Sequence, residues 1–162
     1  MLSDKIIELL DVQINKELHS AYQYLAMANY CASIGFDGAA HWMKKQAGEE
    51  VGHASKIIGY MEDRQVRPTL KSISQPKLDF SGLRDVFEGA VLSEKSVTQS
   101  IDNIAGVALA ESDHATYAFL QWFVTEQVEE EKEAQRLADK VKSLETHIGL
   151  LFALDKELAR RE

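Results

Sequence analysis

The sequence predicts an all-α protein: a four-helix bundle with a long crossover between the second and third helices and a short fifth helix at the C-terminal end. Along four long segments, apolar residues recur in steps of three and four, the spacing that places them on one face of an α-helix. The only two prolines, Pro68 and Pro76, both fall in a stretch from about 66 to 81. A connection of that length can run the length of a bundle, so the second and third helices are expected to lie parallel.

The chain is expected to form one domain over residues 1–162, and turn and cap residues set the bounds of its helices. Gly35 and Gly38 mark the turn between the first two helices, and side-chain caps are available before the first, third and fourth. The last segment carries Ile148, Leu151, Leu154 and Leu158 at helical spacing. The expected helices span 4–33, 38–64, 82–110, 113–143 and 145–160, with Ser3 or Asp4, Ser81, and Ser112 or Asp113 as caps.

The composition of the chain argues against several classes of function. The 162 residues are 45% hydrophobic and 27% charged, as in ordinary globular proteins. The net charge of −8 argues against nucleic-acid binding, and no apolar run approaches the roughly 20 residues that span a membrane. Cys31 is the only cysteine, which fits a reducing compartment. A cytoplasmic location is expected because no signal peptide precedes the first helix; a removed organellar transit peptide is the alternative.

Each of the four apolar stripes is interrupted near its middle by an acidic or amide residue. Mid-length residues of neighbouring helices meet at one level of a bundle, whether the helices run up or down. A histidine one turn after the acidic residue of the second helix shares its face. Because buried carboxylates are costly unless they are paired or bind a cation, a metal site is predicted. The converging residues are Glu17, Glu50, His53, Glu94, Gln127 and Glu130.

One imidazole and four carboxylates form a hard, oxygen-rich ligand set without the thiolates of structural zinc, which favours iron(II) or manganese(II). Glu50, on the central stripe, can bridge two ions about 3.5–4 Å apart. A single glutamate on a helix stripe is usually a side chain at the edge of the core. The same interruption at matching depth in four helices favours the metal interpretation.

A second acidic group, Glu49, Glu126 and Glu129, adjoins these residues. Such a run is usually a solvated helix face. The alternative is that the three carboxylates extend the buried site toward a third cation position on one side of the bundle.

The spacing Glu17…Glu50-x-x-His53…Glu94…Gln127-x-x-Glu130, together with the long crossover, resembles the ferritins. The resemblance covers nearly the whole chain, including residues 119–127 and 155–158, and is closest to bacterial non-haem ferritins. Gln127-x-x-Glu130 stands where rubrerythrins and bacterioferritins have a second Glu-x-x-His. Val51 stands where bacterioferritins carry a haem-ligating methionine, so no haem is expected.

The resemblance assigns roles to these residues. It implies two irons per subunit at a ferroxidase site, with Glu50 shared between them, a possible third iron site as in bacterial members, and Tyr24 beside the iron pair. For Tyr24 and for Trp122, a candidate electron donor, core packing is the alternative. Asp113 and Glu111 fall where family members line iron-entry pores. The implied sets are Glu17, Glu50 and His53 for the first iron, Glu50, Glu94 and Glu130 for the second, and Glu49, Glu126, Glu129 and Glu130 for the third.

The implied function is iron storage with ferroxidase activity. Fe(II) would be oxidised by dioxygen or hydrogen peroxide, and Fe(III) would be stored as a hydrated oxide inside a cage of 24 identical subunits, which the fifth helix favours. The alternatives are a di-iron peroxidase or oxygen-detoxifying protein, a passive iron-buffering cage, and a purely structural bundle.

Overall fold

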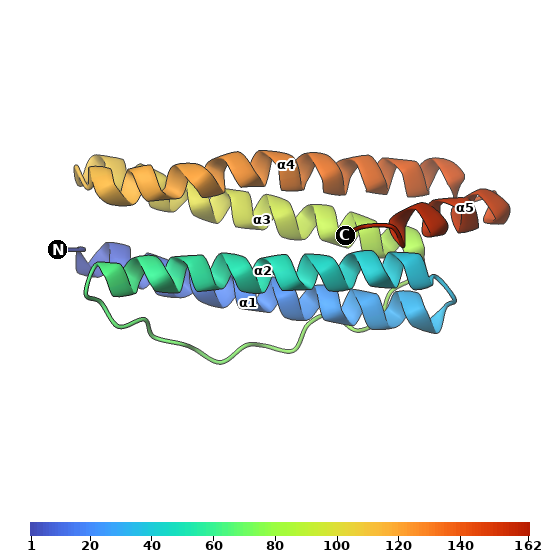
Figure 1. Ribbon diagram of the computed structural model, residues 1–162, viewed down its shortest axis with the longest axis horizontal. Coiled ribbons are helices and arrows are strands. Elements are labelled where there is room, and N and C mark those ends of the chain that lie inside the picture. The colour runs from blue at the N-terminus through green and yellow to red at the C-terminus, as the bar shows by residue number, and fades with distance from the viewer.

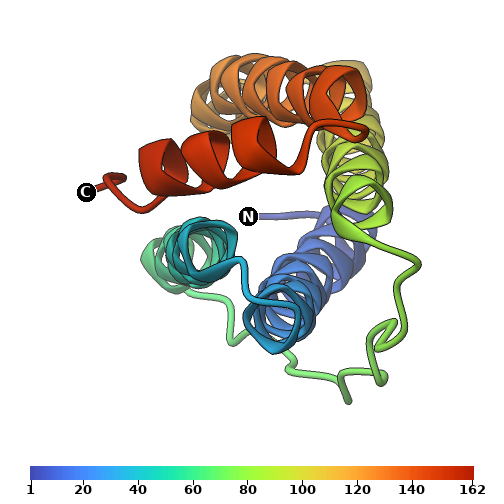
Figure 2. The ribbon, with the colours of Figure 1, turned by 90° about the vertical axis from the view of Figure 1, so that its right-hand side faces the viewer.

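The computed structural model describes residues 1–162 and contains five α-helices and no strands. Four long helices form a bundle, and the short fifth helix lies across one end of it (Figures 1 and 2). The predicted fold class is confirmed. The predicted bounds agree to within one residue for the four long helices, whereas the fifth helix is shorter than predicted. The helices are α1 (Asp4–Ser33), α2 (Asp37–Asp63), α3 (Leu83–Ala110), α4 (His114–Leu144) and α5 (Ile148–Leu158).

The crossover between α2 and α3 runs along the side of the bundle from one end to the other, so α2 and α3 are parallel, as predicted (Figure 1). Side chains of α1 hold it in place. Asp11 accepts a hydrogen bond from the backbone N–H of Thr69 at 2.9 Å. The amide of Gln23 brackets Lys77, accepting from its N–H at 2.9 Å and donating to its carbonyl at 3.1 Å. These contacts account for an ordered path without helix or strand.

Two of the predicted caps are present and one is not. The Ser3 hydroxyl accepts from the N–H of Ile6 at 3.2 Å, and the Asp113 carboxylate accepts from the N–H of Thr116 at 3.1 Å. The prediction that Ser81 caps α3 is wrong, because the residue that precedes α3 is Gly82, which has no side chain.

The start of α2 is capped by α5 rather than by a neighbour in sequence. The Asp155 carboxylate accepts from the N–H groups of Gly38 and Ala39 at 3.0 and 2.7 Å. Gly35 lies in the predicted turn with a φ of +82°, but Gly38 lies inside α2. A Cβ on Gly38 would lie 1.8 Å from the backbone oxygen of Asp155. Glycine is therefore required at position 38 by the close approach of α5.

The apolar core is divided into two clusters by a polar band at mid-height. One cluster includes Phe87 and Leu137 on the α5 side, and the other includes Ile57 and Ile101 toward the opposite end. Of the polar residues predicted to interrupt the four apolar stripes, Glu17, Glu50, Glu94 and Gln127 are buried and Glu130 is partly exposed. None of the five helices combines the length and apolar character needed to cross a membrane.

Candidate metal centre

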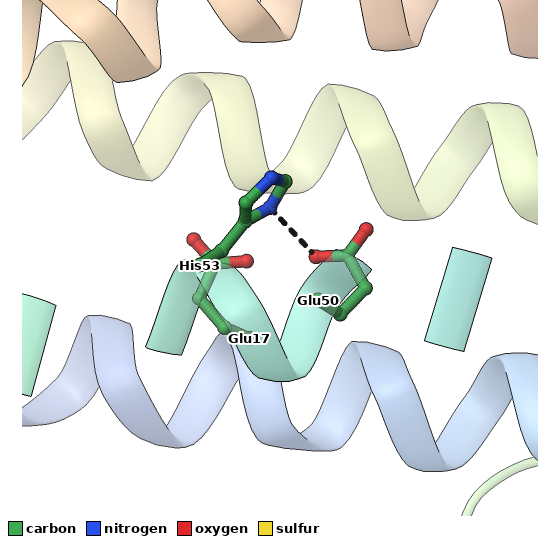
Figure 3. Close-up of side chains that lie close together, drawn as sticks. All are labelled: Glu17, Glu50 and His53. Carbon is green, nitrogen blue, oxygen red and sulfur yellow. Dashed lines mark hydrogen bonds and ion pairs between the residues drawn. The ribbon is translucent and has the colours of Figure 1, made fainter. Parts of the chain in front are cut away.

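Glu17 of α1 and Glu50 and His53 of α2 converge inside the bundle, and all three are buried. Each offers a ligand atom, and these three atoms lie within 4.8 Å of one another. Figure 3 shows the three side chains pointing toward one another, with His53 Nδ1 3.3 Å from Glu50 Oε2. The predicted meeting of these residues at one level is present in the structure.

Two carboxylate oxygens of this group have no hydrogen-bond partner. Glu17 Oε2 and Glu50 Oε1 are both buried and unpaired. Leaving a buried polar oxygen unsatisfied costs roughly 1–3 kcal/mol, so such atoms are rare in folded proteins. A cation placed between them would satisfy both, and the donor set fits iron(II).

A second group joins α2 to α4. Ligand atoms of His53, Glu126 and Glu130 also lie within 4.8 Å of one another, and the two carboxylates are partly exposed. His53 therefore belongs to both groups. Glu126, predicted for a third position, lies together with Glu130, predicted for both the second and the third position.

Glu94 of α3 is held by side chains from two other helices. The Tyr24 hydroxyl of α1 donates to Glu94 Oε1, and the Gln127 amide of α4 donates to Glu94 Oε2 at 3.2 Å. All three residues are buried. The structure thus brings Tyr24, Glu94 and Gln127 together, and Tyr24 and Gln127 contact a predicted metal ligand directly.

Burial sets the electrostatics of the centre. It raises the pKa of Glu17 to about 8, and the charge of Glu50 adds to this effect. Burial raises the pKa of Glu50 well above its usual range, with a further contribution from Glu94. The pKa of Glu130 is raised to about 7 by burial and then by Glu94. The metal-free centre therefore retains protons near neutral pH, which a divalent cation would displace.

The remaining predicted third-position residues point elsewhere. The Glu49 side chain is 45% exposed and accepts a hydrogen bond from Arg161 Nη2 at 2.5 Å. The Glu129 side chain is 69% exposed and lies 3.6 Å from Lys132 Nζ. The structure brings Glu126 and Glu130 to the centre and leaves Glu49 and Glu129 on its outer side.

Trp122 lies at the edge of the centre. Its ring centroid is 5.5 Å from that of His53 in an edge-on arrangement, and Lys56 Nζ lies 4.1 Å from the Trp122 centroid. Asp113 and Glu111 lie at one end of the bundle, where Asp113 caps α4 and Glu111 accepts from the Ser3 hydroxyl.

Two buried glutamines of the centre were not among the predicted site residues. The Gln13 amide donates to Glu17 Oε1 at 2.7 Å, and the Gln46 amide donates to Glu130 Oε2 at 2.6 Å. Each glutamine lies four residues before an acidic residue of its own helix, Glu17 or Glu50. A polar residue one turn before a predicted ligand is the signal that identifies them.

Residues 7–144 match the family model described as Ferritin-like domain. The chain therefore belongs to the ferritin family, a family of iron-storage proteins. Among curated relatives, a bacterial non-heme ferritin of Campylobacter jejuni is 37% identical over 156 residues, covering 96% of this chain and 93% of the relative. One from Staphylococcus epidermidis is 37% identical over 161 residues, covering 99% and 97%.

Solved structures agree with this assignment. An open pore ferritin from the archaeon Archaeoglobus fulgidus superimposes with a TM-score of 0.99 at 40% identity, covering all of both chains. A ferritin from the same organism engineered into a closed form gives a TM-score of 0.98. The predicted resemblance to ferritins is confirmed.

Proposed function

We propose that this chain is a ferroxidase and an iron-storage subunit, which oxidises Fe(II) at a paired site and retains Fe(III) as a hydrated oxide. The observation that carries the proposal is the buried group Glu17, Glu50 and His53, in which two carboxylate oxygens have no partner. In a purely structural bundle these two buried oxygens would stay without a partner, and storage without oxidation needs no buried ligand set at mid-height.

Fe(II) is the substrate of this site. Glu17, Glu50 and His53 would bind the first ion. The resemblance to ferritins implies Glu50, Glu94 and Glu130 for the second; of these, Glu130 lies with His53 and Glu126, whereas Glu94 lies outside both groups of close ligand atoms. Gln13 and Gln127 each occupy one oxygen of a carboxylate and so fix its orientation. Protons held by the raised-pKa carboxylates leave as the ions enter.

Two Fe(II) ions then give one electron each to a single oxidant. Dioxygen with two electrons and two protons yields hydrogen peroxide; hydrogen peroxide with two electrons and two protons yields two waters. The chain would hold the two Fe(II) ions side by side, which replaces a collision of three species by a reaction within one complex. Tyr24 contacts Glu94 and Trp122 contacts His53, so both are candidate electron donors to such a site.

Retention of Fe(III) requires an enclosed volume, and we expect a homo-oligomer of 24 subunits. Exposed apolar side chains on α5 support association, because Ile148, Leu150 and Phe152 face solvent in the single chain. The cytoplasmic location and the absence of haem, nucleic-acid partners and membrane partners remain predictions.

The proposal is tested by rapid mixing of the metal-free protein with Fe(II) in air. The Glu50→Ala and His53→Ala variants should lose fast oxidation and still assemble, whereas Glu8→Ala, on the exposed face of α1, should behave as wild type. Retained fast oxidation in both site variants would refute the site assignment. Peroxide turnover with little retained iron would instead indicate the peroxidase alternative.

A further inference from the structure

Arg161, which follows α5, lies against α2 next to the metal centre. Its guanidinium covers the Trp42 ring, 4.6 Å from the centroid, and donates to Gln46 Oε1 at 2.8 Å and to Glu49 Oε2 at 2.5 Å. Its backbone oxygen lies 2.8 Å from His41 Nε2. Both the main chain and the side chain of Arg161 are thus fixed by α2.

The fold brings Arg161 to this place through α5. Asp155 anchors α5 on the first turn of α2 by its two hydrogen bonds to Gly38 and Ala39. The chain after α5 then lies beside α2, as the position of the C-terminal end in Figures 1 and 2 shows. Trp42, Gln46 and Glu49 follow one another at steps of four and three along α2, so one guanidinium can reach all of them.

The contact with Gln46 links Arg161 to the centre. A guanidinium only donates hydrogen bonds, so the carbonyl oxygen of the Gln46 amide faces Arg161. The NH₂ group of the same amide is thereby directed to Glu130 Oε2, at 2.6 Å. Gln46 is fully buried and has no freedom to exchange these partners with water.

The contact with Glu49 hinders the binding of a third cation by this carboxylate. The guanidinium is permanently charged and occupies Oε2, one of the two carboxylate oxygens of Glu49. It also repels a divalent cation that approaches Glu126 and Glu130 from this side. Arg161 is itself largely shielded, with its side chain 23% exposed, so its charge is screened less than that of a free surface arginine.

We propose that Arg161 is a positioning residue of the metal centre: it holds the Gln46 amide toward Glu130 and withholds Glu49 from a third metal ion, so that the centre binds two ions until Arg161 is displaced. The inference rests on the proposed function, because it concerns an additional ion beside the same two positions.

The test is an anaerobic titration of the metal-free protein with Co(II), which binds like Fe(II) without being oxidised. Calorimetry and the visible absorbance of bound Co(II) count the ions. Wild type should bind two ions tightly. The dissociation constant of a third ion should be about tenfold lower in Arg161→Gln than in wild type, which is the size expected for removing one partly shielded charge. Arg160→Gln removes the same charge from the exposed neighbouring residue and should match wild type. Adding Glu49→Gln to Arg161→Gln should abolish the gain.

Equal binding of the third ion by Arg161→Gln and wild type would overturn the inference, as would an equal gain in Arg160→Gln. Arg161→Lys retains the charge but cannot hold both Gln46 and Glu49, so its affinity for the third ion should lie closer to that of wild type than that of Arg161→Gln does. The proposed function fails on a different result. If wild type binds two Co(II) but oxidises Fe(II) slowly, the ferroxidase proposal is refuted. The titration still shows whether Arg161→Gln and Arg160→Gln differ in their affinity for a third ion.

Discussion

Replacing Glu17 by glutamine is expected to stabilise the metal-free protein at pH 8 and to leave its stability near pH 4.5 unchanged. Glu17 is fully buried, and its pKa is raised from an ordinary 4.5 to about 8 by burial and by the charge of Glu50. A protonated glutamic acid and a glutamine have nearly the same shape. The substitution therefore changes mainly the cost of ionisation.

The sign follows from proton linkage. Below pH 4.5 Glu17 is protonated in both the folded and the unfolded chain, and its contribution to stability is fully present. As pH rises from 4.5 to about 8, the unfolded chain ionises while the folded chain stays protonated, so the folded state loses stability. At about 1.4 kcal/mol per pKa unit, the loss is about 4 kcal/mol at pH 8, where Glu17 of the folded chain is half ionised. Glutamine has no such loss.

The assay is urea unfolding of wild type and Glu17→Gln in the presence of a chelator, at several pH values from 5 to 8 and at one protein concentration, because association also contributes to stability. The free energies of unfolding should diverge with rising pH. Glu8→Gln, at an exposed position of the same helix, should follow wild type. Parallel curves for wild type and Glu17→Gln would show that burial does not suppress ionisation of Glu17, and the electrostatic reasoning would be refuted.

Other predictions concern α5 and the response to metal. Gly38→Ala should lower the melting temperature by several degrees, because its Cβ would overlap the Asp155 backbone, whereas Gly48→Ala, with open space around its Cβ, should not. Asp155→Ala should reduce the free energy of unfolding by about 1–2 kcal/mol through loss of the cap on α2, and a chemical melt that shows no change would contradict this role. Adding Co(II) without air should raise the melting temperature more at pH 8 than at pH 5, because protons compete for Glu17 and Glu130; an equal or larger rise at pH 5 would exclude these carboxylates as the main ligands.

Most of the fold and the centre of the site could be predicted from the sequence, because both depend on local periodicity. A rise of 1.5 Å per residue fixes the level at which Glu17 and Glu50 lie, and the bundle then brings them together. The same logic, extended by one turn, would have included Gln13 and Gln46.

The features that escaped prediction depend on contacts between distant parts of the chain. Asp155 caps α2 across more than a hundred residues, and Arg161 reaches Glu49 only because α5 folds back onto α2. Neither residue has a local pattern that points to its partner. Ser81 shows the opposite case, since a good local capping residue is displaced by Gly82 at the actual start of α3.

The central claim, a paired iron site that oxidises Fe(II), is tested most directly by the amplitude of the fast oxidation phase as Fe(II) is added stepwise to the metal-free protein in air. The amplitude should rise linearly and break at two Fe(II) per subunit, and the break should be absent in Glu50→Ala. A slow oxidation proportional to all added iron, without a break, would contradict the claim and leave a cage that binds iron passively.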